Sequence, residues 1–261
     1  MKKEAQKWKV TPIDKLENVT ERFNTQELLE SVDEKCTFSE PLTAKQRQYQ
    51  KKRQHTGDLS GYWHQRYSYF SKIDDGCLID TVGWYSVTPE LIARQVAGRL
   101  PEEVTVLDGF CGVGGNAIAF ALRGCKVIAV ELDRERLKLA INNARIYGVL
   151  DRIQFIRGDY FKVVKKLRDV DVVFLSPPWG GPEYAGREVF RLEAMKIGEK
   201  DPFEYARQLT PNVIYYVPRN TAIMDLCSIE AYESIFVEQH WLNDRFKAMS
   251  VYYGPLFSDF S

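Results

Sequence analysis

A rigid aromatic turn stands where an apolar segment ends, in the residues FLSPPWGGPEY (174–184). Its two adjacent prolines fix the backbone and leave no amide hydrogen to satisfy, and the glycines beyond them allow a ligand to come close. Trp179 would offer a broad face to a flat substrate, with the hydroxyl of Ser176 nearby. A proline turn with one tryptophan is by itself more often structural, so the functional interpretation depends on the neighbouring motifs.

A second motif, LDGFCGVGGN (107–116), joins a β-branched segment to an apolar helical pattern. Its glycines, Gly112 among them, would let the backbone pass close to a ligand, as in nucleotide-binding turns between a strand and a helix. The spacing does not match G-x-G-x-x-G, and the Asp108 carboxylate would repel a pyrophosphate. A carboxylate at this place suits the ammonium group of a cofactor that carries an amino acid.

Two further carboxylates extend this pattern to the ends of the next two predicted strands. Glu131 is placed to accept hydrogen bonds from a ribose diol. Asp159, in RGDYF, is placed to accept a hydrogen bond from an adenine amine. Together with Asp108, these residues predict S-adenosylmethionine as the cofactor, with the glycine turn beside its methionine portion.

The elements that must position these motifs alternate between strands and helices. Short apolar or β-branched runs predict strands at residues 104–108, 126–133, 153–159, 171–179, 212–218, 234–241 and 246–253. Helical patterns predict a helix that begins at Pro89 with Thr88 as its cap, and further helices at residues 116–124, 134–148, 161–168, 202–209 and 222–233.

This alternation predicts an α/β fold with a doubly wound, mostly parallel sheet and helices on both faces. The last two strands are joined too tightly for a crossover, so we expect them to form a C-terminal antiparallel hairpin. Ligands of such a sheet bind at the carboxyl ends of its strands. The SPPW turn after the fourth predicted strand should therefore lie beside the cofactor.

The chain divides by composition into three predicted regions: a polar N-terminal extension at residues 1–40 with weak helical periodicity, a small helical region at 41–87, and an α/β domain at 88–261 that would bind S-adenosylmethionine. Between Lys45 and Lys72 basic residues far outnumber the single acidic residue, Asp58, and aromatic residues stand among them in GYWHQRYSYF. This mixture suits a surface that meets nucleotides, although a solvated helix face can have the same composition.

Composition narrows the partners and the compartment. Lys plus Arg and Asp plus Glu number 36 each, which argues against coating of long nucleic acids but permits a local anionic ligand. The five cysteines include no C-x-x-C pair, and the three histidines are scattered, so we expect reduced thiols, an intracellular protein and no metal site. The sequence shows neither an export signal nor a run of about 18 apolar residues, so no membrane partner is expected.

At these motifs the sequence resembles the trimethylguanosine synthase family, the RNA cap guanosine-N2 methyltransferases. SPPWGGPEY, DGFCGVGGN and GWYSVTPE carry the resemblance, which extends from about Gly61 to Gly254. It implies a Rossmann-like class I methyltransferase fold, and an enzyme that methylates the exocyclic N2 amine of the 7-methylguanosine cap on small nuclear and nucleolar RNAs. The products would be di- or trimethylguanosine caps, made in the nucleus, in the nucleolus or partly in the cytoplasm. Proteins of those small RNAs would be partners through the N-terminal region.

The resemblance also assigns residues by position. Those implied to line the cofactor are Phe70, Ser86, Thr88, Asp108, Glu131 and Asp159. Trp179 would stack on the cap base beside Ser176 and Pro177. Those implied to hold the cap triphosphate are Tyr184, Arg219 and Lys247. Two positions depart from the family: Glu131 replaces an aspartate, which keeps the chemistry, and Gly61 stands where a phosphate-binding lysine is expected, which leaves one phosphate contact unaccounted for.

Two other functions share part of these motifs. A methyltransferase of base amines in internal RNA or DNA would more typically carry Asn or Asp at position 176 and broader positive charge. A catalytically inactive cap-binding module would have no need of the three cofactor carboxylates. The cap substrate is favoured because 7-methylguanine is cationic, and an indole face attracts a cation by roughly 0.5 to 2 kcal/mol. Methyl transfer then needs alignment of the amine by Ser176 and nearby carbonyls, and no general base.

Overall fold

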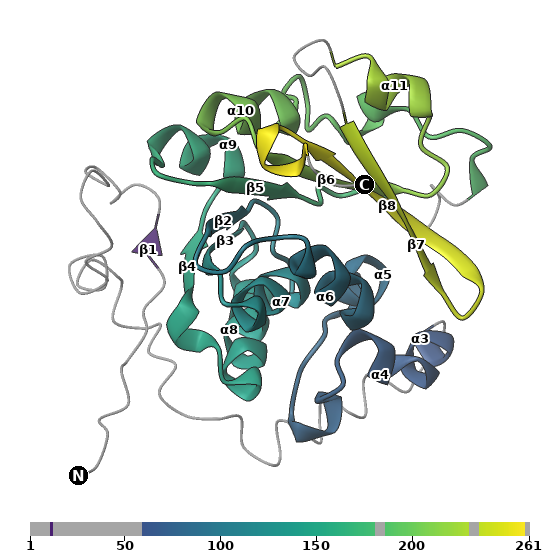
Figure 1. The fold of residues 1–261 in the computed structure, drawn as a ribbon. Coiled ribbons are helices and arrows are strands. Elements are labelled where there is room, and N and C mark those ends of the chain that lie inside the picture. The colour runs from purple at the N-terminus through teal and green to yellow at the C-terminus, as the bar shows by residue number, and fades with distance from the viewer. Residues whose placement is uncertain (1–10, 13–58, 181–185, 230–234, 259–261) are drawn as a thin grey trace.

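The computed structural model describes residues 11–12, 59–180, 186–229 and 235–258. An eight-stranded sheet crosses the middle of the protein in the order β1-β4-β3-β2-β5-β6-β8-β7 (Figure 1). The strands are β1 (Thr11–Pro12), β2 (Thr105–Asp108), β3 (Lys126–Glu131), β4 (Ile153–Arg157), β5 (Val172–Leu175), β6 (Val213–Pro218), β7 (Ile235–Leu242) and β8 (Arg245–Tyr253). All neighbours are parallel except β6 with β8 and β7 with β8. The predicted parallel sheet and its closing antiparallel hairpin are thus confirmed.

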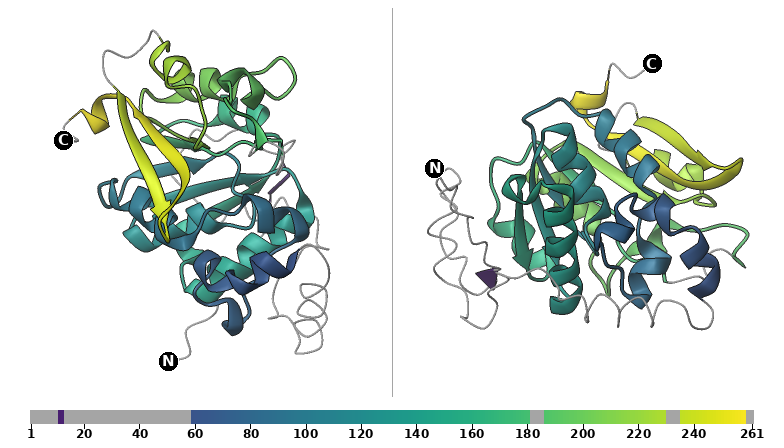
Figure 2. Two further views of the ribbon diagram at one scale, coloured as in Figure 1. Left: turned by 90° about the vertical axis from the view of Figure 1, so that its right-hand side faces the viewer. Right: turned by 90° about the horizontal axis from the view of Figure 1, so that it is seen from below.

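Helices cover the sheet on both faces (Figure 2). One face carries α6 (Glu90–Gly98), α7 (Gly115–Arg123) and α8 (Arg134–Tyr147), and the other carries α9 (Tyr160–Val163), α10 (Pro202–Leu209) and α11 (Ile223–Cys227). Each face has its own hydrophobic core, and successive strand residues alternate between them, as Val106 and Leu107 do. Because both faces are covered, every residue of β2, β5 and β6 is buried.

The short helices before α6 belong to the same packed structure. They are α3 (Ser60–His64), α4 (Arg66–Tyr69) and α5 (Thr81–Ser86). Phe70 and Trp84 are buried in the core that also holds residues of α6 and α7. The domain boundary at residues 87 and 88 stays a prediction, and apart from β1 the N-terminal extension lies outside the described residues.

The predicted cap of α6 is wrong. The helix begins at Glu90 with Pro89 at its N-cap and no side-chain capping bond. Pro89 is in an extended conformation, with φ −54° and ψ 137°, so Thr88 lies one residue too early to cap. Its hydroxyl instead accepts a hydrogen bond from Nδ2 of Asn116 at 3.0 Å, which joins the start of α6 to the start of α7.

A buried carboxylate attaches the C-terminal hairpin to α6. Oε1 of Glu238 on β7 accepts hydrogen bonds from Arg99 at 2.6 Å and Gln95 at 2.9 Å, and its Oε2 accepts one from the Tyr252 hydroxyl at 2.7 Å. Burial alone would raise the pKa of Glu238, but the bond from Arg99 and the other donors hold it below its usual value. The hairpin is therefore fixed by an ionised group with a full set of donors.

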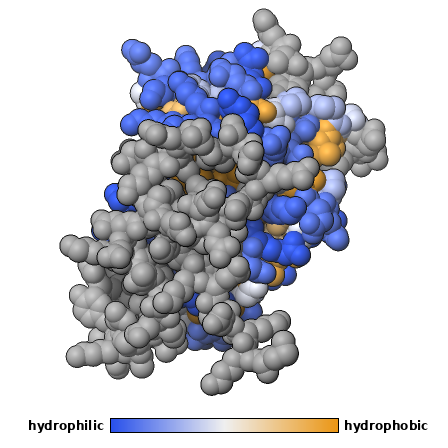
Figure 3. Space-filling model, turned by 90° about the vertical axis from the view of Figure 1, so that its left-hand side faces the viewer, coloured by the Kyte–Doolittle hydropathy of each residue, from blue (hydrophilic) through white to orange (hydrophobic). Residues whose placement is uncertain are grey.

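The outer surface is mostly polar where the described residues can be seen from the β4 side (Figure 3). Hydrophobic residues show there only as small separate spots. Among the residues that the structure describes, no helix has the length and apolar content needed to span a bilayer.

Candidate active site

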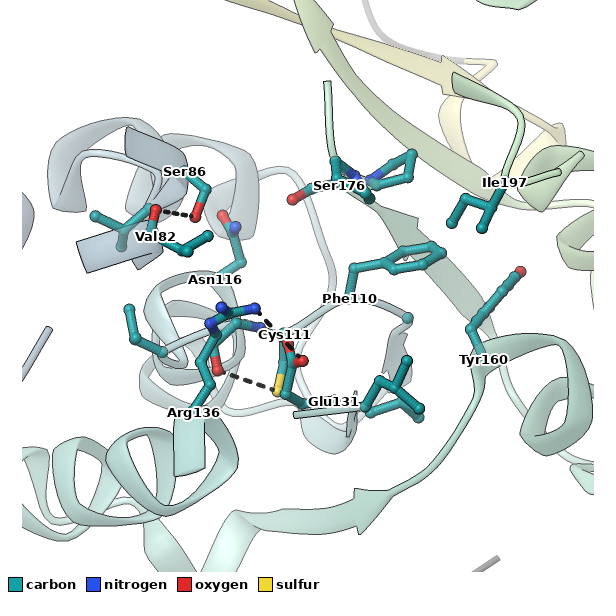
Figure 4. A pocket seen from close by; sticks show the side chains of 18 of the residues that line it. Val82, Ser86, Phe110, Cys111, Asn116, Glu131, Arg136, Tyr160, Ser176 and Ile197 are labelled. Carbon is teal, nitrogen blue, oxygen red and sulfur yellow. Dashed lines mark hydrogen bonds and ion pairs between the residues drawn. The ribbon is translucent and has the colours of Figure 1, made fainter. Parts of the chain in front are cut away.

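A cavity of about 690 Å³ opens at the carboxyl ends of the parallel strands (Figure 4). Its walls come from the segments that follow β2, β3, β4 and β5, together with α5 and the loop near Ile197. This is the edge where a doubly wound sheet binds its ligands. The volume lies within the range of about 300 to 1,000 Å³ that is usual for small-molecule sites.

The structure brings most of the predicted site residues together. Those that line the cavity are Ser86, Thr88, Gly112, Glu131, Asp159, Ser176, Pro177 and Trp179. Phe70, Asp108, Arg219 and Lys247 do not line it, and Tyr184 lies outside the described residues. Phe70 is buried with its ring centroid 6.0 Å from that of Tyr147, on the side of the core that faces α8.

The glycine turn needs its glycines for two different reasons. Gly112 and Gly114 have φ values of 54° and 92°, in the left-handed region that other residues avoid. A Cβ on Gly109 would lie 2.8 Å from ring atoms of Tyr160. Gly109 and Gly112 therefore form a wall of bare backbone along the cavity, whereas a Cβ on Gly114 would lie 3.2 Å from that of Ala140 on α8.

Glu131 lies at the end of β3 with both carboxylate oxygens already oriented. Oε2 accepts from the Gly112 amide at 3.1 Å, and Oε1 accepts from the Asp133 amide at 2.9 Å. The Arg136 guanidinium is 3.7 Å from Oε1. Burial raises the pKa of this carboxyl, and it outweighs the hydrogen bonds from the two amides and the charge of Arg136, which lower the pKa. An ionised carboxylate has lone pairs for about four donors, so Glu131 can still accept hydrogen bonds from a ligand in the cavity.

Asp108 lies directly behind the wall and is fully buried. Its Oδ1 accepts a long bond of 3.4 Å from the Phe110 amide, and its Oδ2 has no hydrogen-bond partner among the described residues. Burial raises the pKa of Asp108 to about 7, and the charge of Glu131 adds to this. The Ala117 amide favours the charged form without reaching hydrogen-bond geometry. A buried oxygen without a donor is costly, so this place fits a cofactor that brings a positive group.

The SPPW turn forms the opposite wall. Trp179 is half-buried and stacks on Tyr216 of β6, with ring centroids 5.4 Å apart and planes at 29°. Ser176 is half-buried just after β5, and Phe110 lies between it and Tyr160 (Figure 4). The Tyr216 ring thus covers one face of the indole and helps to fix the position of Trp179 at the cavity.

Several lining residues were not predicted from the sequence. Phe110 and Tyr160 have ring centroids 4.9 Å apart and make an aromatic wall after β2 and β4. Asn116 lines the cavity with a buried Oδ1 that has no partner among the described residues. The available signal was that Asn116 is the one strongly polar residue before Arg123 in the apolar helix GNAIAFALR.

Two of the predicted phosphate-binding residues lie together near the hairpin. Arg219 follows the end of β6 and is exposed, and Lys247 is half-buried on β8. Burial lowers the pKa of Lys247, and the charges of Arg245 and Arg219 lower it further. Both arginines therefore lie close enough to Lys247 to disfavour its charged form.

Comparisons with known proteins bear on the family and on the fold. Residues 103–256 match a family described as RNA cap guanine-N2 methyltransferase. A trimethylguanosine synthase of Schizosaccharomyces pombe is 37% identical over 209 residues, or 75% of this chain and 86% of the relative. One from Saccharomyces cerevisiae is 40% identical over 181 residues, or 65% of this chain and 58% of the relative. A solved putative methyltransferase from Porphyromonas gingivalis has a TM-score of 0.53 at 13% identity, over 74% of this chain and 48% of that one, and shares the fold.

Proposed function

This chain belongs to the RNA cap guanine-N2 methyltransferase family, and we propose from that premise how its residues act on a 7-methylguanosine cap. The reaction transfers methyl groups to the exocyclic N2 amine of the cap guanine. When bound, S-adenosylmethionine supplies a methyl group already activated on its sulfonium. The protein must therefore bind both molecules and align the amine with the methyl group.

The cofactor is assigned to the side of the cavity formed by the glycine turn. Glu131 would accept from the ribose hydroxyls, and Asp159 from the adenine amine. Asp108 would provide the negative charge opposite the ammonium group, because its Oδ2 has no hydrogen-bond partner among the described residues and the next residue, Gly109, lines the cavity. Ser86 and Thr88 line the same cavity from α5 and the segment after it. Phe70 is proposed to support this side from the core.

The cap base is assigned to Trp179, and the stack of Trp179 on Tyr216 is the observation that carries the proposal. A cationic 7-methylguanine would extend this stack, because the negative faces of aromatic rings attract cations. Unmethylated guanine lacks that charge. The site should therefore select caps that already carry the 7-methyl group.

The amine is assigned to the SPPW turn itself. Ser176 and the backbone carbonyls beside Pro177 would accept hydrogen bonds from the amine hydrogens, which directs the nitrogen lone pair toward the methyl group. The surplus proton would then leave to water. This leaves alignment as the main contribution of the protein to the rate.

The cap triphosphate is assigned to Arg219 and Lys247, with Tyr184 as a further contact from outside the described residues. The substrates proposed are small nuclear and nucleolar RNAs, and the products di- or trimethylguanosine caps made in the nucleus. Residues 41–87 are proposed as the cap-side region, and residues 1–40 as the contact to proteins of those RNAs.

Mass spectrometry of a cap analogue tests the proposal. A 7-methylguanosine triphosphate cap dinucleotide, incubated with the protein and S-adenosylmethionine, should gain one or two methyl groups on N2. The same dinucleotide without the 7-methyl group should gain almost none. Methylation of an internal base in an uncapped RNA, with no change in the cap analogue, would assign the chain to the alternative class of base-amine methyltransferases.

A further inference from the structure

The β7–β8 hairpin extends past its neighbour in the sheet. The pairing of β6 with β8 ends at Pro218 opposite Ala248, whereas β8 starts at Arg245 and pairs with β7 to the end of that strand at Leu242. This overhang lies at the carboxyl end of β6, the same edge of the sheet at which the cavity opens. Figure 1 shows the hairpin reaching well beyond β6 on this side.

An irregularity in the pairing places two aromatic rings on one side of the overhang. His240 pairs with Ala248, but the next residue, Trp241, pairs with Phe246. Lys247 is therefore an extra residue on β8, a β-bulge that reverses the alternation of side chains beyond it. As a result Phe246 faces the same side as Trp241, and their rings stack with centroids 5.1 Å apart and planes at 15°.

These two rings, which we call the hairpin platform, differ in exposure. Phe246 is half-buried and packs against the hydrophobic core on the α10 face of the sheet. Trp241 is 57% exposed although it is the largest kind of side chain. Its Nε1 donates a 3.4 Å bond to Oε1 of Gln239. The indole is thus held flat on Phe246, and the exposed part of it faces solvent.

A group of cations lies beside the hairpin platform. Arg219, Arg245 and Lys247 come from the end of β6 and the start of β8, and the charges of both arginines act on Lys247. None of the three forms an ion pair with a carboxylate among the described residues. Cations gathered without acidic partners favour a polyanionic ligand.

We propose that the hairpin platform and Arg245 bind the single-stranded RNA that follows the cap triphosphate. This rests on the proposed function, which assigns Arg219 and Lys247 to the triphosphate. A chain that continues outward from those phosphates reaches the end of the hairpin, where Trp241 and Arg245 stand in adjacent pairs of the two strands. An aromatic face beside a cationic track is the combination that binds single-stranded nucleic acid without reading its sequence. Arg245 would contact the phosphate after the first transcribed nucleotide, and the platform would stack the base that follows it.

Affinity for two capped ligands of different length tests the inference. The probes are a 7-methylguanosine cap dinucleotide and the same cap on a single-stranded RNA of about ten nucleotides. The wild-type protein should bind the longer probe more tightly. Trp241→Ala should weaken binding of the longer probe on the order of tenfold, from the loss of one stacked base, and should leave the dinucleotide unchanged. Trp241→Phe should keep most of the difference.

Two controls make the experiment specific. Leu122→Ala removes an exposed apolar side chain from α7 and should affect neither probe. Arg245→Gln should reduce the dependence of longer-probe binding on salt, because one phosphate contact is lost. Thermal unfolding should show all these variants as stable as the wild type, since the altered side chains are exposed.

The outcomes separate this inference from the proposed function. Equal wild-type affinity for the two probes, or a Trp241→Ala variant that binds the longer probe normally, would overturn the hairpin inference while cap methylation stands. Normal binding of the longer probe by Trp241→Ala would indicate that Trp241 contacts a protein partner instead of RNA. Absence of methyl transfer to any capped ligand would instead overturn the proposed function.

Discussion

The Arg136 guanidinium on α8 lies 3.1 Å from the Asp80 carboxylate, which caps the first turn of α5. The same guanidinium is 3.7 Å from Glu131, the carboxylate at the end of β3. Arg136 thus connects the helix that supplies Ser86 to the cavity with the residue assigned to the ribose. One side chain therefore contributes both to the position of α5 and to the charge environment of Glu131.

Replacement of Arg136 should therefore weaken cofactor binding. Arg136→Gln should raise the dissociation constant of S-adenosylmethionine about fivefold, as expected for roughly 1 kcal/mol from a partly exposed ion pair. Asp80→Asn, which loosens α5 but leaves Glu131 paired, should have a smaller effect. Titration calorimetry measures both, with Lys138→Gln on the same helix as the control. If Arg136→Gln bound S-adenosylmethionine as tightly as the wild type, the proposed role of Arg136 in cofactor binding would be wrong.

Asp108 should lower the stability of the folded protein at neutral and alkaline pH, and it should strengthen binding of the cofactor. Its pKa is raised to about 7 from the ordinary value of 3.8, so the folded protein prefers the protonated form. The stability gained from this preference is full below about pH 4 and is lost as pH rises through about 7. Asp108→Asn should then be more stable than the wild type at pH 8, by a few kcal/mol, and nearly equal to it at pH 4.

The same Asp108→Asn variant should bind the cofactor poorly, because it has no charge for the ammonium group. In the wild type, affinity should rise as pH increases through about 7, while the variant should lack this rise. Chemical denaturation and calorimetry across pH give both readouts. A variant that is less stable at pH 8, or that binds as well as the wild type, would argue against a buried cofactor-facing charge at this place.

Trp179 should distinguish cationic from neutral bases. Trp179→Ala should lower kcat/KM for 7-methylguanosine caps at least tenfold, and Trp179→Phe should keep part of the activity, since a smaller ring still attracts the cation. Cofactor affinity should stay nearly constant. Steady-state kinetics on caps with and without the 7-methyl group provide the measurement. Equal rates on both caps would mean that the tryptophan is a core residue only.

The effects of Arg219 and Lys247 should depend on phosphate number. Arg219→Ala and Lys247→Ala should each raise KM for a triphosphate cap several-fold, and less for 7-methylguanosine monophosphate. Lys126→Ala is a matched control, because this exposed lysine begins β3 at the opposite end of the sheet. If each variant raised KM by the same factor on every substrate, the assignment of Arg219 and Lys247 to the cap phosphates would be wrong.

The features that could be predicted from the sequence are those specified locally. The β-branched runs identify β2 and β3, because burial on both faces of a parallel sheet requires continuous apolar residues. The glycine turn after β2 indicates the edge at which the cavity opens. The SPPW turn follows β5 directly, so its position at the carboxyl edge of the sheet, where it lines the cavity, could be predicted from the apolar run before it. In each case a single continuous segment of the sequence is enough to predict the element.

The features that could not be predicted depend on contacts between distant segments. Asn116 meets Thr88 only after α6 and α7 pack together, and Asp80 meets Arg136 although the two are 56 positions apart along the chain. The two-residue strand β1 shows no periodicity. The Trp241–Phe246 stack depends on a bulge, and regular alternation along β8 would have placed Phe246 on the opposite side.

The buried Glu238 has a consequence for aggregation. It lies on β7, the last strand in the order of the described sheet, and such a strand offers its unpaired backbone groups to other chains. The buried charge opposes exchange of this strand, because any foreign strand that displaced or shifted β7 would separate the carboxylate from Arg99 and Tyr252. The bulge at Lys247 adds a second obstacle by twisting the end of the hairpin. The element proposed to receive RNA is thus also built to resist fibrous self-association.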